Sequence, residues 1–479
     1  MWGGRFDRGR RDPQFEQFSQ SFSFDQRLIH YDLRVNQVYV RHLAAAGVLA
    51  KSDARNIARG LDAIGKHVEA HPGWAARESS EDVHTWVENK LEAEVGQAAK
   101  KLRTGRSRND LVATETRLFA KDAIDELLTA LAALLDAVLE KATQHHQVIM
   151  PGYTHLQPAQ PVLCAHYLLA YFEMLLRDEG RLRDCRDRAD ELPLGAGALA
   201  GTTVRIDRSA LAADLGFARA ARNSIDATSD RDFVCELIFA CSLIQIHLSR
   251  LAEDLIIFSS PAFGYVELAD DYATGSSLMP QKKNADSLEL IRGKTARVAG
   301  RLASMMMLLK GLPLAYNRDL QEDKEALFDA VDTARESLRL AARVVATLRV
   351  HPERMRAATQ LGFLTATDVA DELVRRGLPF AEAHEATGKL VRYCLSSGKN
   401  FAELSLEEAR GVIPGWDQSL QQIAASPERS IEARNVTGGT APAQVARQLG
   451  AAAENLAELT RRLHARGPAG QERKRPRRP

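Results

Sequence analysis

Long stretches of apolar residues at helical spacing constrain the fold of this 479-residue chain more than any other feature. Between residues 121 and 146 apolar side chains recur every three or four positions, which is the period of one helix face. Further stretches with this period, all longer than an average helix, are 162–191, 231–259, 287–311 and 323–350. Their apolar faces are wider than the seam between two coiled helices, so we expect a long-helix bundle that packs against other subunits.

The distribution of helical stretches predicts an all-α fold with three helical domains. Shorter, more mixed helices before residue 105 indicate an N-terminal domain at 1–105, and the long helices indicate a central bundle at 106–352. After about residue 352 the helices again look short, which predicts a C-terminal domain at 353–464. Residues 465–479 combine Pro, Gly and a basic run, and we expect a disordered tail there. Strand signals are scarce.

Composition argues against several classes of function. The net charge of +1 gives no bulk electrostatic reason to bind nucleic acid or a membrane. The N-terminus lacks the apolar core of a signal peptide, and no apolar run approaches the roughly 20 residues that span a bilayer. We therefore expect a cytoplasmic protein. The five cysteines show no CxxC spacing, so neither a disulfide framework nor a zinc site is expected.

Two glycine motifs look like nucleotide-binding loops but have the wrong spacing. "GAGALAG" at 195–201 differs at the third glycine and follows no predicted strand. "GKT" at 293–295 lacks a glycine five positions earlier, where Leu288 stands. We interpret both as packing or turn glycines.

Four polar clusters interrupt the helical pattern where helices are expected to begin or end. They are "SSEDVHTWVENKL" at 79–91, "TGRSRND" at 104–110, "PGYTHLQPAQP" at 151–161 and "GSSLMPQKKN" at 275–284. Each alone has an ordinary explanation, since "SRND" could cap a helix and His155 could be a structural histidine.

Together, these clusters supply charged and neutral donors that suit carboxylates. The donors are Arg108, Asn109, Thr154, Lys282 and Asn284. His155 and the serines of 275–284 add groups that can transfer protons. No metal or cofactor motif stands beside them, so the sequence favours proton chemistry on a carboxylate substrate.

At these clusters the sequence resembles the argininosuccinate lyase family of the fumarase/aspartase superfamily. "GSSLMPQKKN" is similar to the superfamily's signature loop, and its Gln-Lys-Lys-Asn ending is similar to the lyase version. The other matching segments are "MWGGRF" at 1–6, "FSQSFSFD" at 18–25, "NSIDATSDRDF" at 223–233, "YNRDLQEDKE" at 316–325 and "GFLTATDVADELV" at 362–374. The resemblance covers nearly the whole chain.

The resemblance implies a reaction and an assembly. The reaction is reversible cleavage of argininosuccinate to L-arginine and fumarate, a step of arginine biosynthesis, by anti β-elimination through a carbanion drawn as an aci-carboxylate. The resemblance implies neither metal nor organic cofactor. It also implies a homotetramer whose active sites are each built from three subunits, which suits clusters that lie far apart in the chain.

The resemblance also assigns roles to residues. Ser276 is expected to be the general base, with its alkoxide stabilised by Lys282 and by backbone donors of a closed loop 275–284. His155 is expected to be the general acid or to organise it. The residues expected to bind substrate are Ser21, Arg108, Asn109, Thr154, Asn284, Tyr316, Gln321 and Lys324.

Further expectations concern orientation within the site. Arg108 would hold a carboxylate of the succinate half, whereas Tyr316, Gln321 and Lys324 would face the arginine half. The residues expected to orient the binding groups are Asp82, His84 and Glu88. Loop 275–284 is expected to close over the substrate as a lid.

The match departs from the family pattern at Arg103, where His is common, and at Leu111, where Gln is usual. Asn36 stands at a common Ser position and Ala285 at a common Pro position. Two alternatives therefore stay open. One is a superfamily lyase acting on another succinyl or guanidino adduct. The other is a non-catalytic structural protein related to lens crystallins, although retention of the proton-transfer groups argues against it.

Overall fold

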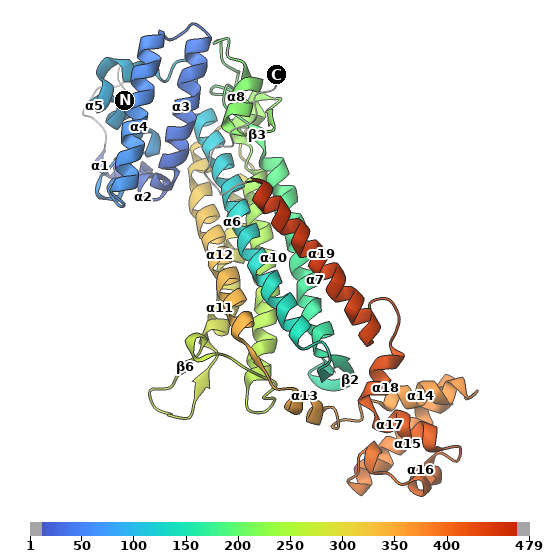
Figure 1. Cartoon of the computed structure of the whole chain (residues 1–479). Helices are drawn as coiled ribbons and strands as arrows, with labels where there is room; N and C mark the ends of the chain where they lie inside the picture. The colour runs from blue at the N-terminus through green and yellow to red at the C-terminus, as the bar shows by residue number, and fades with distance from the viewer. Residues whose placement is uncertain (1–11, 467–479) are drawn as a thin grey trace. The chain divides into compact units, whose positions relative to one another are not determined.

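The computed structural model describes residues 12–466 and consists mainly of helices (Figure 1). Within this range the chain divides into two compact units. Unit 1 comprises the residues up to Leu127, Gly180–Leu243 and Ala296–Ala334; unit 2 comprises Leu128–Glu179, Ile244–Thr295 and the residues from Arg335 onward. The all-α class expected from the helical periodicity is confirmed.

The three-domain division expected from the sequence is a different partition of the chain and stays a prediction. The described part of the predicted tail, residues 465 and 466, ends the last helix. The rest of that tail lies outside the described residues, as does the matching segment "MWGGRF".

Five long helices lie where the apolar period predicted them. They are α6 (Arg108–Gln144), α7 (Cys164–Ala189), α10 (Asp232–Ser259), α11 (Asp286–Leu309) and α12 (Asp323–Thr347). Only α6 begins well before its expected start at residue 121. Its first turns bury polar side chains, among them Asp110, Thr114 and Glu115, and these conceal the apolar period there.

Three helices near the N-terminus, α3 (Ile29–Ala45), α4 (Lys51–Ala70) and α5 (Val83–Val95), pack on one another in unit 1 (Figure 1). A Cβ at Gly60 of α4 would lie 2.7 Å from Val95 Cγ1, so the close approach of α4 and α5 requires glycine. The shorter helices of this unit are α1 (Pro13–Ser19), α2 (Phe22–Asp25), α8 (Arg208–Leu215) and α9 (Ser224–Ser229).

An aromatic and ionic contact joins the N-terminal segment to the long helices within unit 1. The rings of Phe119 on α6 and Phe328 on α12 pack edge to face, with centroids 4.7 Å apart. The guanidinium of Arg27 lies 5.0 Å and 4.9 Å from the two ring centroids and donates to both carboxylate oxygens of Asp332, at 2.6 and 2.7 Å. The contact fixes residues 22–28 against the helices that follow.

In unit 2 the cluster "PGYTHLQPAQP" lies between the end of α6 and the start of α7, as expected, but it forms a β-hairpin that the sequence did not predict. Strand β1 (Ile149–Thr154) pairs antiparallel with β2 (Gln157–Leu163), although the strands contain three prolines. A two-stranded ribbon tolerates proline because every strand in it is an edge. The Tyr153 hydroxyl lies 2.5 Å from that of Tyr265, which anchors the hairpin within the unit.

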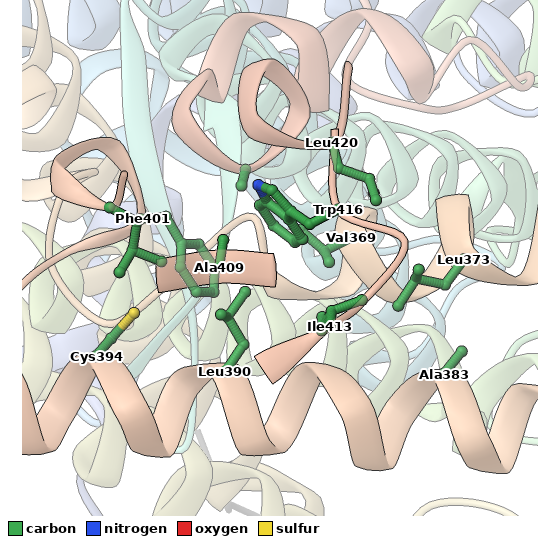
Figure 2. Packing of buried hydrophobic residues seen from close by; sticks show 12 residues of the cluster. Val369, Leu373, Ala383, Leu390, Cys394, Phe401, Ala409, Ile413, Trp416 and Leu420 are labelled. Atoms are coloured by element: carbon green, nitrogen blue, oxygen red, sulfur yellow. The ribbon is translucent and has the colours of Figure 1, made fainter. Parts of the chain in front are cut away.

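The C-terminal part of unit 2 has its own apolar core (Figure 2). Trp416, only 1% exposed, is at its centre, and its indole N–H donates to Gln421 Oε1 at 2.9 Å. The surrounding helices are α14 (Ala366–Arg375), α15 (Phe380–Ser397), α16 (Leu406–Val412) and α17 (Gln418–Ala425). The expectation of only short helices after residue 352 is wrong, because α19 (Pro442–Arg466) has 25 residues.

The remaining elements are short. The helices are α13 (Pro352–Ala358) and α18 (Pro427–Ala433). The two-residue strands are β3 (Glu191–Leu192) with β4 (Arg219–Ala220), β5 (Val266–Glu267) with β8 (Arg349–Val350), and β6 (Thr274–Gly275) with β7 (Lys283–Asn284).

One helix corrects the expectation that no apolar run approaches membrane-spanning length. By length and composition α10 qualifies, and 56% of its apolar window is buried inside the structure. The core helix of a soluble protein meets the same criterion, so this is weak evidence for a membrane segment.

Candidate functional site

A polar pocket in unit 1 has a volume of about 830 Å³. Its lining comes from segments that are far apart in the sequence, around residues 21–25, 81–84, 103–112, 197–203 and 316–324. The cations among the lining residues are Arg103, Arg106, Arg108, Arg318 and Lys324, and the acidic residues are Asp25, Glu81 and Asp82. This excess of cations suits a ligand that carries several carboxylates.

The turn before α6 is held in place by Asp110. The Ser107 hydroxyl accepts from the Asn109 amide at 3.2 Å, while Asp110 Oδ1 accepts from the Ser107 amide at 3.0 Å. These reciprocal bonds begin the helix as in a capping box, which confirms the capping interpretation of "SRND". Asp110 Oδ2 also accepts from the amides of Gly195 and Gly197, at 3.0 and 2.8 Å. Asp110 therefore ties two pocket segments together.

The glycines of "GAGALAG" are turn glycines, as expected. Gly195, Gly197 and Gly201 have φ values of 97°, 61° and 88°, which a side chain would disfavour. Their open backbone brings two amides to the buried Asp110 carboxylate. Burial raises the pKa of Asp110 to about 6, even though these amides favour its charged form. The other dismissed motif, "GKT", lies inside α11.

Arg108 lines the pocket and is bonded to its neighbours. Its Nη1 donates to Asp82 Oδ2 at 2.9 Å and its Nη2 to Thr85 Oγ1 at 2.8 Å. Asp82 in turn caps α5 by accepting from the Thr85 amide at 2.7 Å. Burial opposes ionisation of Asp82, but the charges of His84 and Arg108 hold its pKa below the ordinary value. The Asn109 amide group, also at the pocket, donates to Ala198 O at 3.4 Å.

A buried cluster of charged residues lies next to the lining segment 316–324. Asp323 is fully buried and accepts from Arg231 Nε and from Lys324 Nζ, the latter at 2.7 Å. Two cations on one carboxylate leave a net positive charge beside the pocket. Burial raises the pKa of Tyr316, which lines the pocket nearby. Gln321 also lines it and donates to Ser19 O at 3.2 Å.

Ser21 is buried at the end of the pocket formed by α2. Its hydroxyl donates to Asp25 Oδ2 at 2.6 Å, and its amide donates to Glu81 O at 2.9 Å. Asp25 Oδ1 accepts from the Val83 amide at 3.1 Å. Burial raises the pKa of Asp25 to about 6. These bonds connect residues 21–25 to the start of α5.

Below the pocket lies a second cluster, in which Asp32, His84 and Glu115 are all buried and only His84 lines the pocket. Their ligating atoms lie within 4.8 Å of one another, close enough to hold a cation. Asp32 is already bonded, however, with Oδ2 2.8 Å from His84 Nδ1 and Oδ1 2.5 Å from Asn36 Nδ2. We therefore do not assign these residues as metal ligands.

The signature loop 275–284 belongs to unit 2. Ser276 is half-buried, and its hydroxyl oxygen accepts from the amides of Leu278 and Met279, at 3.2 and 3.0 Å. Lys282 is exposed, and Asn284 Nδ2 donates to Gly275 O at 3.4 Å. Strands β6 and β7 close the base of this loop.

Thr154 and His155 are exposed at the turn of the β-hairpin. His155 and Leu156 have φ values of 55° and 56°, a left-handed conformation that is uncommon for residues other than glycine. Backbone strain of this kind persists where the surroundings fix it, and the bond between the Tyr153 and Tyr265 hydroxyls provides such an anchor.

The structure brings eight of the expected site residues together at the pocket. They are Ser21, Asp82, His84, Arg108, Asn109, Tyr316, Gln321 and Lys324. Glu88 lies behind the lining, with Oε1 3.1 Å from Arg103 Nε. Within residues 12–466, the pocket lining does not include Thr154, His155, Ser276, Lys282 or Asn284, all of which belong to unit 2.

Several residues at or behind the pocket were not singled out from the sequence. They are Asp25, Arg106, Glu115, Arg231 and Asp323. Asp25, Arg231 and Asp323 stand inside segments that match the family, so the signal was present but no role was assigned. Arg106 also stands inside a matching segment, "TGRSRND", whereas Glu115 gave a weaker signal, because a lone charge in a helical stretch is usually solvent-exposed.

The departures from the family pattern fall in different places. Arg103 lines the pocket, whereas Leu111 is buried in the core at 2% exposure. Asn36 is buried beside Asp32. Ala285 follows the signature loop in unit 2, so Arg103 is the one of these four departures that lines the pocket.

Comparison with known proteins gives a consistent result. Residues 4–300 match the family described as "Lyase", and residues 363–432 match "Argininosuccinate lyase C-terminal". The chain is 51% identical to argininosuccinate lyase of Pelotomaculum thermopropionicum, covering 96% of this chain and 99% of that one. It is also 51% identical to argininosuccinate lyase of Moorella thermoacetica, over 96% and 98%.

The fold is similar to that of a solved structure, EDDS lyase in complex with formate. The TM-score is 0.85 at 28% sequence identity, over 96% of this chain and 93% of that chain. A variant of EDDS lyase with bound fumarate gives a TM-score of 0.84 at 27% identity.

Proposed function

Because this chain belongs to the argininosuccinate lyase family and cleaves argininosuccinate to arginine and fumarate, we propose that the unit 1 pocket binds this substrate and that Ser276 and His155 carry out the proton transfers. The chain is thus an enzyme of the fumarase/aspartase superfamily. The observation that carries the reaction is 51% identity to curated relatives over 96% of the chain.

The composition of the pocket supports the binding part of the proposal. Argininosuccinate carries three carboxylates, and the lining offers cations together with neutral donors. Arg108 and Asn109 would hold the succinate half, and Tyr316, Gln321 and Lys324 the arginine half. For Arg108 to hold a carboxylate, substrate must share or replace its bond to Asp82.

Ser276 is the proposed general base, and its surroundings address the weakness of serine in that role. A neutral hydroxyl is a poor base, so its alkoxide needs hydrogen-bond donors. The amides of Leu278 and Met279 already donate to Oγ. Lys282 would add a positive charge once the loop closes and excludes water, which strengthens each of these interactions.

His155 is the proposed group that protonates the departing guanidino nitrogen or organises that step. An imidazole near neutral pH can hold and release a proton without a large energetic cost. Its position on a strained hairpin turn, anchored through Tyr153 and Tyr265, would restrict its orientation. Thr154 and Asn284 would contribute donors to the same substrate carboxylate.

We further propose that the sites are completed in a homotetramer, each from three subunits, in a cytoplasmic enzyme of arginine biosynthesis that requires no cofactor. The pocket lining comes from unit 1 alone, whereas the proposed acid, base and loop donors lie in unit 2. In a tetramer, the unit 1 pocket of one chain would receive these groups from unit 2 of neighbouring chains. The groups therefore need not meet within a single chain.

The alternatives are less favoured. The similarity to EDDS lyase favours the first alternative, a superfamily lyase that acts on another succinyl adduct. However, the sequence identity to EDDS lyase is 28%, whereas that to argininosuccinate lyase is 51%. A crystallin-like structural role would not require the cationic pocket or the donors around Ser276.

The decisive assay is fumarate absorbance in the ultraviolet after argininosuccinate is added to the purified protein. We expect absorbance to rise, and a Ser276→Ala variant of the same assembly to give at least a hundredfold lower rate. A well-folded wild-type protein that produces no fumarate from argininosuccinate would refute the proposal. Activity confined to other succinyl adducts would identify the first alternative.

A further inference from the structure

Three helices of unit 1 meet at a buried polar cluster that the proposed reaction does not use. Asp32 comes from α3, His84 from α5 and Glu115 from α6. Their side chains are 1%, 5% and 0% exposed. Glu115 Oε1 lies 3.7 Å from His84 Nδ1, and His84 lines the pocket above the cluster.

The contact with Asp32 places a hydrogen on His84 Nδ1 and fixes the orientation of the ring. An ionised aspartate oxygen can only accept, so with the shared proton resting on Glu115, His84 Nδ1 carries the hydrogen in its 2.8 Å contact with Asp32 Oδ2. Asp32 Oδ1 accepts from the Asn36 amide group at 2.5 Å. Asp32 is therefore the acceptor that two other side chains share.

Glu115 cannot be an isolated carboxylate in this position. Among residues 12–466, neither of its oxygens accepts a hydrogen bond from a protein donor, and the side chain has no exposure to water. A buried anion without donors is strongly unfavourable, whereas a neutral carboxyl carries an O–H that can donate to the neighbouring carboxylate. Burial, the charge of Asp32 and a hydrogen bond with Asp32 all raise the pKa of Glu115 well above its ordinary value.

We propose that Glu115 is a neutral carboxylic acid that shares its proton with Asp32, and that this pair holds His84 in the Nδ1–H form against the pocket. Glu115 is then a positioning residue that acts on substrate through Asp32 and His84. The carboxyl oxygens of Asp32 and Glu115 lie within 4.8 Å of each other. Two buried carboxyl groups this close hold one proton between them, because their negative charges would repel if both ionised. The pair and a protonated His84 together carry no net charge.

The functional consequence rests on the proposed use of the unit 1 pocket. His84 follows two residues after Asp82, which bonds Arg108, so displacement of His84 disturbs the first turn of α5 and the Arg108 contact. Burial lowers the pKa of His84, but the hydrogen bond that it donates to Asp32 and the charge of Asp82 raise it overall. The imidazole thus adds positive charge to the lining, which favours an anionic substrate.

The test compares two variants of nearly equal size at Glu115. Glu115→Gln keeps a donor for Asp32, and we expect kcat/KM within about threefold of wild type. Glu115→Met removes the donor, and we expect kcat/KM about ten- to hundredfold lower, mainly through KM, which is the loss typical of one buried hydrogen bond to a charged group. Circular dichroism and assembly size serve as folding controls.

A spectroscopic measurement is independent of turnover. The infrared spectrum of the wild-type protein should contain a protonated-carboxyl band at neutral pH that disappears in Glu115→Gln. Neutron diffraction of the wild-type protein, which needs no variant, should place one hydrogen between Glu115 and Asp32.

Two outcomes would overturn the inference. Glu115→Gln as impaired as Glu115→Met would mean that Glu115 acts as a carboxylate. A stoichiometric divalent cation in the purified wild-type protein, lost in Glu115→Gln, would make the cluster a metal site. If the wild-type protein itself fails to cleave argininosuccinate, the proposed function fails, while the infrared and neutron results still decide the state of Glu115.

Discussion

Asp110→Asn tests how the pocket is held together. The substitution keeps the shape of the side chain but replaces one acceptor oxygen by an N–H₂ donor. Wild-type Asp110 accepts from three backbone amides, those of Ser107, Gly195 and Gly197. An asparagine can serve the two glycines with its oxygen, but its amide nitrogen then faces the Ser107 amide, and two donors meet.

The magnitude follows from counting the unpaired donors. In the better orientation one buried backbone N–H loses its acceptor, which costs about 1–3 kcal/mol. The opposite orientation leaves two donors unpaired and is worse. If this free energy is lost through displacement of Arg108 and Asn109 from their positions at the pocket, kcat/KM falls by about five- to 150-fold. A free-energy change of 1.36 kcal/mol corresponds to a factor of ten.

The assay is kcat/KM for argininosuccinate by fumarate absorbance, together with the urea midpoint at a fixed protein concentration. Asp136→Asn on the exposed face of α6 is the matched control and should leave both unchanged. Wild-type kinetics and stability in Asp110→Asn would refute the idea that this carboxylate joins the two pocket segments.

Further predictions concern the proton-transfer groups and two buried carboxyls. His155→Asn should lower kcat by about 10²–10⁴-fold with assembly intact, and an unchanged rate would remove His155 from the mechanism. Asp323→Asn leaves the buried cation Lys324 without its carboxylate and should cost about 3–5 kcal/mol in urea unfolding; a loss below about 1 kcal/mol would contradict this. Burial raises the pKa of Asp25 from 3.8 to about 6, so the folded state binds that proton more tightly and loses stability as pH rises from about 4 to 6. Asp25→Asn should reduce the loss of stability across that pH range by up to about 3 kcal/mol in melting curves, while Asp110 continues to contribute; an identical pH dependence in both proteins would contradict the prediction.

The sequence predicted the long helices well, because their apolar faces are buried along most of their length. The end of α10 at Ser259, for example, coincides with the end of the apolar stretch. The hairpin at 149–163 was missed because proline normally disfavours strands. Proline is tolerated here because both strands of a two-stranded ribbon are edge strands, which the sequence does not reveal. The length of α19 was missed because its alanine-rich, charged sequence has a weak apolar period.

The candidate site was predicted only in part, because it depends on contacts between residues that are distant in sequence. Residue types suited to carboxylates were visible in the sequence, but their partners were not, because Asp110 meets Gly195 across 85 residues and His84 meets Asp32 across 52. The buried polar start of α6 also concealed Glu115, whose significance depends on helices distant in sequence. One sequence gives no distances between such positions.

The most direct test of a site shared between subunits is activity in mixed tetramers. Ser276→Ala removes the proposed base from one set of chains, and Lys324→Met removes a pocket cation from the other. Each variant alone should be nearly inactive. After dissociation and random reassembly in equal amounts, about a quarter of the sites receive both native residues from different chains, so we predict about a quarter of wild-type activity. Mixed tetramers that form but stay inactive would contradict the account.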